Sequence, residues 1–354
     1  MNNDTPRKVT MKQNGSSKII VLVIMAAVVF AGALLWFYQQ RKQVVTNGTT
    51  PAALNFRIKF SIYSGFAPHF VALEKGYYAK EGLNVDIQPG GPGIDPLKIV
   101  LTGDADVGLA SYDQIILARE KGLPLIAIGE DTTKSGVGFI SLASSRIKTP
   151  QDFIGRKVGV MPGTDKGTVY EALMAKLGID RSKIQEIPVQ FNLAVLFNGT
   201  VDVFPAFITN QPIIAKDSGF EVNIIDPDQY GISPGGNVFF TSEDTSRKKQ
   251  DILEAFLRAE LAAIMDSQSM NDGEVVDCVL KYNNQLKRDT EIKIWQATKA
   301  MILPKDRSIV GIMPRDKWEH TAQLFKQAGL LKNIPDLEKC YTNALVDDIH
   351  KRGF

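Results

Sequence analysis

Residues 63–85 and 103–111 constrain the fold of this chain more than any other part of it. They read YSGFAPHFVALEKGYYAKEGLNV and GDADVGLAS. The first segment predicts a Gly- and Pro-containing loop after a strand, then a short helix and a second strand. The second predicts a third strand, whose Ala and Gly residues allow other backbone to approach closely. Because neither segment contains a side chain that looks like a nucleophile, the pair predicts a compact α/β unit rather than a catalytic motif.

Strand-like and helical runs alternate along the chain, which is typical of parallel α/β sheets. Strands are expected at 56–61, 84–88, 106–110, 126–130, 139–143, 158–160, 184–188 and 237–242. The run NGTVDV at 198–203 repeats the small-residue, Asp, apolar order of GDADVG, so we expect one unit used twice, as two lobes. Residues 237–242 are expected to return to the first lobe and to pair beside 139–143 as a two-strand hinge that allows closure. Residues 247–354 are expected to be mostly helical.

An uncharged run of 20 residues, 19–38, lies near the N-terminus. As a helix it would be about 30 Å long, the thickness of a bilayer core. Four basic residues precede it and two follow closely, which places the N-terminus in the cytoplasm. The alternative is a cleaved secretory signal ending at Ala31-Gly32-Ala33. We expect an uncleaved signal anchor in a single-pass protein of the cell membrane, with an extracytoplasmic globular part.

The expected organisation follows from this anchor and from the repeated unit. Its parts are a cytoplasmic N-terminus (1–18), the transmembrane anchor (19–38), a linker (39–55), lobe 1 with the C-terminal helices (56–143 plus 241–354), and lobe 2 (144–240).

Charge and cysteine content narrow the function classes. The chain has 41 basic and 39 acidic residues, and residues 1–54 hold six basic and one acidic, so the remainder has 35 basic and 38 acidic, a net charge of −3. This mild acidity argues against a nucleic-acid partner. Cys278 and Cys340 are expected to be two buried thiols rather than a disulfide. Since no Cys/His metal-binding spacing is present, we expect no metal and no cofactor.

The motifs resemble those of a known family. The phrase around Lys75-Gly76-Tyr77-Tyr78 and the GDADVG run are similar to the NMT1/THI5-like substrate-binding proteins, which are related to sulfonate-, nitrate- and taurine-binding proteins. The resemblance extends from Phe56 to about Asp348. It implies a two-lobed type II periplasmic-binding-protein fold, a small-molecule ligand and an ABC permease as partner. The TNQP run at 209–212 is similar to the family's TNEP, with Gln211 in place of Glu.

The candidate ligand-binding residues lie in loops that face the inferred cleft, where ligands collect in open α/β sheets. They are Ser64, Gly65, Phe66, Gly91, Gly93, Ser111, Tyr112, Asp113, Gly163, Thr164, Asp165, Phe207, Asn210, Gln211, Tyr230 and Asn237. Tyr112 and Phe207 are expected to clamp a flat ring. Alternatives remain for each group: the glycines could only form turns, Asp165 could only cap a helix, and the aromatic residues could be core.

Three functions fit these features. The leading hypothesis is the extracytoplasmic solute-binding component of an ABC importer, with a flat heterocyclic ligand such as a thiamine-pyrimidine precursor or, less favoured, a sulfonate or nitrate. The second is a pyrimidine synthase of the same fold. It is disfavoured because Phe66 stands where the family's enzymes carry His and because His69 is expected to be structural. The third is a membrane-anchored sensory module. We expect a protein that is not an enzyme.

Overall fold

Two five-stranded sheets organise the part of the chain that this computed structural model describes, residues 50–91 and 93–354. The predicted cytoplasmic N-terminus, the signal anchor at 19–38 and most of the linker lie outside these residues. Among the described residues, no helix is both long and apolar enough to cross a membrane. The strands and helices below belong to one unit, Pro51–Phe354.

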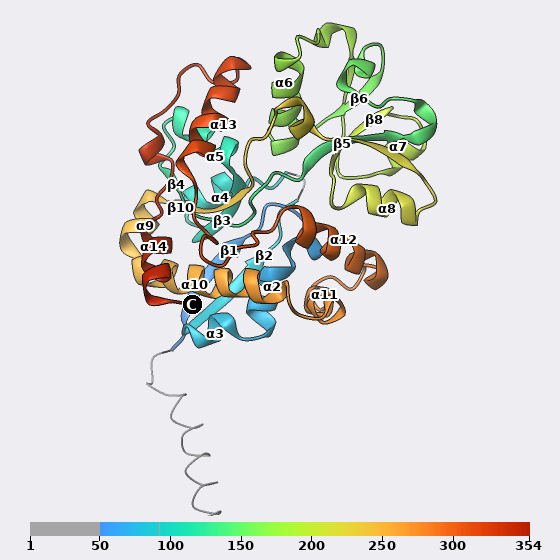
Figure 1. The fold of residues 1–354 in the computed structure, drawn as a ribbon. Coiled ribbons are helices and arrows are strands. Elements are labelled where there is room, and N and C mark those ends of the chain that lie inside the picture. The colour runs from blue at the N-terminus through green and yellow to red at the C-terminus, as the bar shows by residue number, and fades with distance from the viewer. Residues whose placement is uncertain (1–49, 92) are drawn as a thin grey trace, which may run out of the picture. The chain divides into compact units, whose positions relative to one another are not determined.

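The first sheet has the strand order β2-β1-β3-β10-β4, and the second has the order β7-β6-β8-β5-β9. The first contains β1 Ala52–Arg57, β2 Leu83–Gln88, β3 Val107–Ser111, β4 Leu125–Glu130 and β10 Asn237–Ser242. The second contains β5 Val137–Leu142, β6 Lys157–Val160, β7 Gln185–Pro188, β8 Val203–Phe207 and β9 Val222–Ile225. We call the two sheets with their helices the first and second lobes; Figure 1 shows the second lobe at the upper right.

The predicted hinge pairing is wrong. β10 is antiparallel to β3 and β4 in the first sheet, whereas β5 is antiparallel to β8 and β9 in the second. Each of these strands is inserted between two neighbours, so neither has a free edge with which to pair with the other. The strand predicted at 139–143 therefore belongs to the second lobe. The chain crosses between the sheets through residues 131–136 and 226–236, and the second of these segments includes a short helix at 227–230.

The expected repeat is present in the topology and in matching hydrogen bonds. In both sheets the fourth strand is the antiparallel one, contributed by the chain as it crosses between lobes. Asp106 accepts a hydrogen bond from Asn55 N (2.9 Å) and donates its own N–H to Asn55 O (2.9 Å). Asp202 does the same with Lys157, at 2.9 Å and 2.8 Å. The shared Asp therefore lies directly before β3 in one lobe and β8 in the other, and ties that strand to β1 or β6.

Helices cover both sheets, and the C-terminal region is mostly helical as predicted. In the first lobe these are η1 Ser64–Phe66, α2 Ala67–Glu74, α3 Tyr77–Lys80, α4 Pro96–Thr102, α5 Tyr112–Glu120, α9 Glu243–Lys248, α10 Gln250–Ser267, α11 Asp272–Leu280, α12 Arg288–Met301, α13 Arg315–Gln327, η6 Leu337–Lys339 and α14 Ala344–Arg352. In the second they are η2 Ala143–Ser145, η3 Pro150–Phe153, α6 Asp165–Lys176, η4 Arg181–Lys183, α7 Ala194–Phe197, α8 Gln211–Asp217 and η5 Pro227–Tyr230. Both cysteines are buried and free, as expected.

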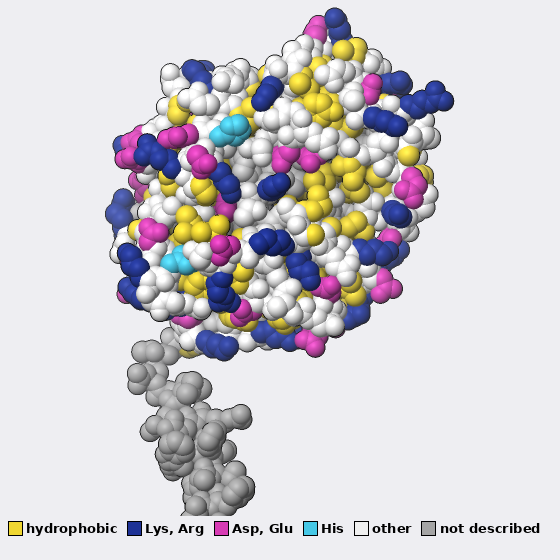
Figure 2. Space-filling view, viewed as in Figure 1, with side chains coloured by type: hydrophobic (Ala, Val, Ile, Leu, Met, Phe, Trp, Pro, Cys, Tyr) yellow, Lys and Arg dark blue, Asp and Glu magenta, His cyan; other side chains and the backbone are white. Residues whose placement is uncertain are grey.

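The surface carries mixed charge. On the face shown in Figure 2, basic and acidic side chains of the described residues are interspersed, and hydrophobic side chains gather over the second lobe, toward the right of the view. This face thus presents no single-signed field that would steer a polyanion to it.

Candidate ligand-binding site

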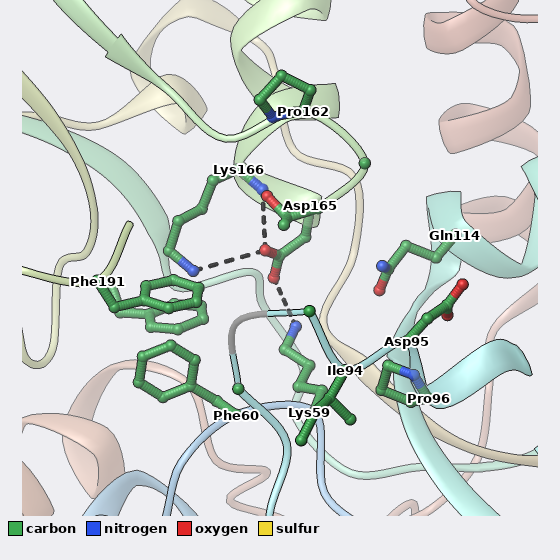
Figure 3. A pocket seen from close by; sticks show the side chains of 15 residues that line it. Lys59, Phe60, Ile94, Asp95, Pro96, Gln114, Pro162, Asp165, Lys166 and Phe191 are labelled. Atoms are coloured by element: carbon green, nitrogen blue, oxygen red, sulfur yellow. Dashed lines mark hydrogen bonds and ion pairs between the residues drawn. The ribbon is translucent and has the colours of Figure 1, made fainter. Parts of the chain in front are cut away.

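A cavity of about 280 Å³ lies between the lobes. Loops that follow β1, β2, β6 and β7 contribute to its wall, together with α5 and the end of β8, and several of these side chains point toward one another in Figure 3. The lining residues are Lys59, Phe60, Gly91, Gly93, Ile94, Asp95, Pro96, Gln114, Pro162, Gly163, Thr164, Asp165, Lys166, Phe191 and Phe207. Because both lobes supply residues, a molecule bound here would be held by the closed arrangement.

Lys59 and Phe60 reach the cavity because β1 ends at Arg57. The chain then turns, and Phe60 O accepts a hydrogen bond from Gly90 N at 2.9 Å. A Cβ atom on Gly90 would lie 2.5 Å from the carbonyl carbon of Lys59, so only glycine allows the loop after β2 to pass so close. This packing fixes the backbone that carries Lys59.

A charge cluster, made of Lys59, Asp165 and Lys166, spans the lobes at the cavity wall (Figure 3). Lys59 Nζ lies 2.6 Å from Asp165 Oδ2, and Lys166 Nζ lies 3.5 Å from Asp165 Oδ1. Asp165 is the first residue of α6, and its Oδ1 also accepts a hydrogen bond from Lys166 N at 2.8 Å. All three side chains are at most 10% exposed, so their mutual attraction is weakly screened.

An aromatic cage, made of Phe60, Phe191 and Phe207, surrounds the ammonium group of Lys166. Lys166 Nζ lies 3.2 Å from the ring centroid of Phe207, 5.0 Å from that of Phe191 and 5.5 Å from that of Phe60. The Phe60 and Phe191 rings meet edge to face at 4.1 Å. The cage thus holds a cation against ring faces, an arrangement that is most favourable where water is excluded.

Burial and neighbouring charge shift both acid–base groups of α6. Burial alone would raise the pKa of the Asp165 carboxyl, but Lys166 and Lys59 hold that pKa well below its usual range. Burial lowers the pKa of the Lys166 ammonium to about 8, with Asp165 opposing the shift and Lys59 adding to it. At neutral pH the cavity therefore presents an ionised carboxylate between two ammonium groups.

Six of the residues predicted from sequence line this cavity: Gly91, Gly93, Gly163, Thr164, Asp165 and Phe207. Thr164 caps α6, with its Oγ1 accepting from Gly167 N at 3.3 Å. Asp165 is not the capping residue of α6. Its carboxylate faces Lys59 and Lys166 instead. The structure therefore brings the predicted second-lobe loop and the Gly-rich first-lobe loop to the same cavity.

The predicted aromatic clamp does not form around this cavity, because Tyr112 lies away from it. Tyr112 is fully buried, donates a hydrogen bond to Glu130 Oε1 at 2.7 Å and packs on Trp318 with ring centroids 4.5 Å apart. Its role is in the contact between α5 and α13. Phe207 is partnered in the cavity by Phe60 and Phe191 instead.

Five other predicted residues of the first lobe lie outside the cavity lining and make contacts within the surrounding structure. Ser64 N donates to Glu291 Oε2 at 2.7 Å, and the ring of Phe66 packs on that of Tyr63. A Cβ atom on Gly65 would lie 2.4 Å from the Tyr63 ring, so a larger residue would displace that ring from its present position. Ser111 caps α5 in a capping box, and Asp113 accepts from Thr168 Oγ1 of the second lobe at 2.6 Å. These residues fix the wall without lining the cavity.

The remaining predicted residues also lie outside the cavity lining. Gln211 Oε1 accepts from Phe207 N at 2.7 Å, so its amide is used to hold the end of β8. Asn210 is buried next to Tyr63, and Tyr230 lies in η5, outside the cavity lining. Asn237 Nδ2 donates to Asp131 Oδ2 at 3.3 Å, at the connections between the lobes.

The sequence prediction missed Lys59, Phe60 and Phe191. Lys59 and Phe60 fell inside the strand predicted at 56–61, whereas β1 is shifted by four residues toward the N-terminus and is paired from Ala52↔Leu83 onward. The available signal was Leu54, which continues the alternation of buried residues with Phe56. Phe191 lies just before α7, and an aromatic residue near a helix start formed no sequence pattern that would predict a ligand contact.

Comparisons with known proteins agree on a family. A sequence profile described as NMT1/THI5 like matches residues 64–269, more than half of the chain. The chain is 28% identical over 196 residues to the formylaminopyrimidine-binding protein of Halalkalibacterium halodurans, which covers 54% of this chain and 59% of that protein. This chain thus spans less than two thirds of that relative.

Two further relatives are matched over most of their length. The 4-amino-5-hydroxymethyl-2-methylpyrimidine phosphate synthase of Legionella pneumophila is 24% identical, over 79% of this chain and 88% of that protein. The riboflavin-binding protein RibY of Chloroflexus aurantiacus is also 24% identical, over 79% of this chain and 82% of that protein. Since one is named as an enzyme and the other as a binding protein, length of match does not separate the two activities.

Solved structures agree on the fold. The alkanesulfonate-binding protein SsuA of Xanthomonas axonopodis pv. citri, bound to MOPS, superimposes with a TM-score of 0.64 at 14% identity, over 84% of this chain and 100% of that protein. At this identity the likeness establishes the two-lobed periplasmic-binding-protein fold and does not extend to the ligand.

Proposed function

The chain belongs to the NMT1/THI5-like family, and we propose that within it the protein is a solute-binding receptor of an ABC importer that closes two lobes on a small flat heterocycle. Thiamine-pyrimidine precursors are the favoured ligands. The receptor would deliver its ligand to a permease in the membrane.

The observation that carries this proposal is the aromatic-lined cavity at the junction of the lobes. Three phenylalanine rings, two lysines and two carboxylates, those of Asp95 and Asp165, line a volume of about 280 Å³. This is near the lower limit of typical ligand pockets, about 300 Å³. A single heteroaromatic ring with small substituents suits such a space better than a three-ring ligand does. The polar groups among the lining residues would orient the ring.

The names of the relatives support a pyrimidine as ligand. One relative is named for binding a formylaminopyrimidine and another for making a hydroxymethyl pyrimidine phosphate. For the synthase alternative, a histidine at the cavity would support acid–base chemistry. His69 is instead buried, with Nδ1 2.8 Å from Glu260 Oε2 in the core of the first lobe. Binding is therefore favoured over catalysis.

We further propose that residues 19–38 anchor the receptor in the cell membrane, with the lobes outside the cytoplasm. The support is the length and apolar character of this run. Extraction of membranes at alkaline pH tests the proposal, because an uncleaved anchor would leave the full chain in the membrane pellet.

Native mass spectrometry of the full chain tests the receptor function. The protein would be purified in mild detergent without refolding, and a retained small molecule with a heteroaromatic ring is the expected result. Retention of a sulfonate or nitrate would refute the flat-ligand proposal. Formation of a pyrimidine after incubation with pyridoxal phosphate and iron would favour the synthase. Co-purification with a permease would separate an importer component from a sensory module.

A further inference from the structure

Residue 211 cannot supply the carboxylate that a protonated aminopyrimidine would need. It is Gln in this chain, and its amide oxygen already accepts a hydrogen bond from Phe207 N. Asp165 is the buried, ionised carboxylate that lines the cavity itself. Both of its oxygens face ammonium groups, Oδ2 toward Lys59 and Oδ1 toward Lys166. The chain therefore holds a carboxylate whose two oxygens are occupied by its own cations.

The aromatic cage also indicates a ligand that carries a positive charge. Cages of this type select cations by their ring faces, and here the occupant is the ammonium of Lys166, 3.2 Å from the centroid of Phe207. A ligand that displaced the ammonium groups of both Lys59 and Lys166 would leave the Asp165 carboxylate with only the Lys166 backbone N–H as a donor. Burying an unpaired carboxylate is costly, so the ligand must bring its own donor or positive charge.

We infer that Asp165 is the carboxylate that recognises the ligand, and that Lys59 and Lys166 occupy its place in the ligand-free protein. The ligand class is a planar ring with amidine-like N–H donors, such as a 4-aminopyrimidine protonated at the neighbouring ring nitrogen. Its two parallel N–H groups match the two carboxylate oxygens in a bidentate pair. Its ring lies within the aromatic cage. This inference rests on the proposed function.

An anionic ligand fits the same geometry less well. Two lysines could attract a sulfonate or phosphate, but Asp165 stays ionised between them and would repel it at short distance. An anion would also lie against ring faces, whose quadrupole favours cations. The charge cluster therefore favours a ring with several N–H donors over an anion. Binding of an anion is one of the outcomes that the test below distinguishes.

The test is the substitution Lys166→Met, which keeps the length of the side chain and removes its charge. Only molecules in which Lys166 has left the cage can bind the ligand, so this internal occupant lowers the apparent affinity. Its removal should therefore tighten binding, on the order of tenfold. Isothermal titration of the full chain in detergent with 4-amino-5-hydroxymethyl-2-methylpyrimidine measures this. Lys183→Met, on the exposed surface of the same lobe, is the matched control and should bind like the wild type.

Two additional measurements keep the inference falsifiable. The analogue without the amino group should gain nothing from Lys166→Met, and the double variant Lys166→Met, Asp165→Asn should lose the gain. Unchanged or weaker binding of the aminopyrimidine to Lys166→Met, while the wild type binds it, would overturn the inference and leave the proposed function intact. Binding of benzenesulfonate that is lost in Lys166→Met would also overturn it. A wild type that binds no heteroaromatic ring would instead refute the proposed function.

Discussion

At the scale of single residues, a second buried charge network extends from the core of the first lobe to the connections between the lobes. His69 Nδ1 lies 2.8 Å from Glu260 Oε2, and His69 Nε2 lies 3.8 Å from Asp131 Oδ1. Tyr78 also donates to Glu260, and Asn237 donates to Asp131. Asp131 and Asn237 lie at the ends of the two connections between the lobes. The charge on His69 therefore acts on the residues at which the lobes are joined.

His69 is expected to stay protonated above the ordinary range of a histidine. Burial alone would lower its pKa, but Glu260 and Asp131 raise the pKa overall. The folded state then binds the proton more tightly than the unfolded chain, whose pKa is about 6.5. The stability that this gives is complete below that pH and is lost as pH rises through the folded-state pKa.

Nuclear magnetic resonance of ¹⁵N-histidine-labelled protein measures this directly, since the chain has only three histidines. His69→Gln assigns the signal. Its midpoint should lie above about 6.5. The free energy of unfolding should fall over the same pH range in the wild type and less in His69→Gln, with His320→Gln on the exposed face of α13 as control. A midpoint below that of a free histidine would contradict the prediction.

Sequence reasoning at this scale found the loops but not all their side chains. Asp165 was identified because it lies in the loop after the strand predicted at 158–160, and Phe207 because it lies beside the TNQP run that resembles the family's TNEP. Lys59 escaped because the register of β1 depends on its pairing with β2, which is a long-range contact. Tyr112 was misplaced for a related reason: its partner Trp318 is far along the chain, and only the packing of α13 on α5 shows that the ring is core.

At the scale of elements, the paired Asp residues explain why the two lobes share a sequence pattern. Asp106 and Asp202 each make the same two hydrogen bonds to the residue opposite. A short acidic side chain directly before a strand can accept from the backbone of its neighbour, and this ties the third strand of the unit to the first. The pattern visible in GDADVG and NGTVDV was therefore a sound predictor of a repeated unit.

Removing these side chains should cost stability unequally. Asp202→Ala loses one hydrogen bond to backbone, worth about 1 kcal/mol. Asp106→Ala should cost more, because Asp106 also pairs with Lys249 Nζ at 2.6 Å. Urea unfolding followed by circular dichroism gives both values, and Asp104→Ala, at an exposed neighbouring position, is the control. If Asp104→Ala and Asp202→Ala lowered the free energy of unfolding equally, the contact shared by Asp106 and Asp202 would contribute nothing specific to stability.

At the scale of the whole molecule, the lobes are held together by polar contacts as well as by the charge cluster. Thr168 Oγ1 donates to Asp113 Oδ2 at 2.6 Å beside the cavity. Farther away, Asp217 of α8 accepts from Thr290 Oγ1 and Lys293 Nζ of α12, both at 2.6 Å. These contacts can break when the lobes separate, so they set part of the balance between open and closed forms.

The two-lobed organisation was predictable from sequence, but the way the lobes are joined was not. The repeat and the alternation of strands and helices sufficed for two α/β units. Which strand pairs with which is decided between segments more than 100 residues apart, as for β3 and β10. The local pattern of β10 is that of any buried strand, so its place between β3 and β4 could not be read from its own residues.

Thr168→Val should shift the molecule toward the open form. The substitution keeps the shape of the side chain but removes the donor to Asp113, whose pKa is already raised by burial. Opening lets water replace the lost hydrogen bond, so the closed form loses on the order of 1 kcal/mol and ligand affinity falls about fivefold. Thr290→Val is the matched control, because Lys293 still pairs with Asp217 and the shift should be smaller.

Double electron–electron resonance between spin labels on Ile154→Cys in the second lobe and Ile309→Cys in the first measures the shift, since both positions are exposed and the native cysteines are buried. The distance distribution of Thr168→Val should gain a longer component that ligand removes, because the ligand binds the closed form better and pulls the population back. Identical distributions in Thr168→Val and the wild type would mean that the Thr168–Asp113 contact does not contribute to closure, which would then depend on the charge cluster and the contacts of Asp217. Lys59→Met, which removes one ion pair of the charge cluster, would then be expected to open the cleft.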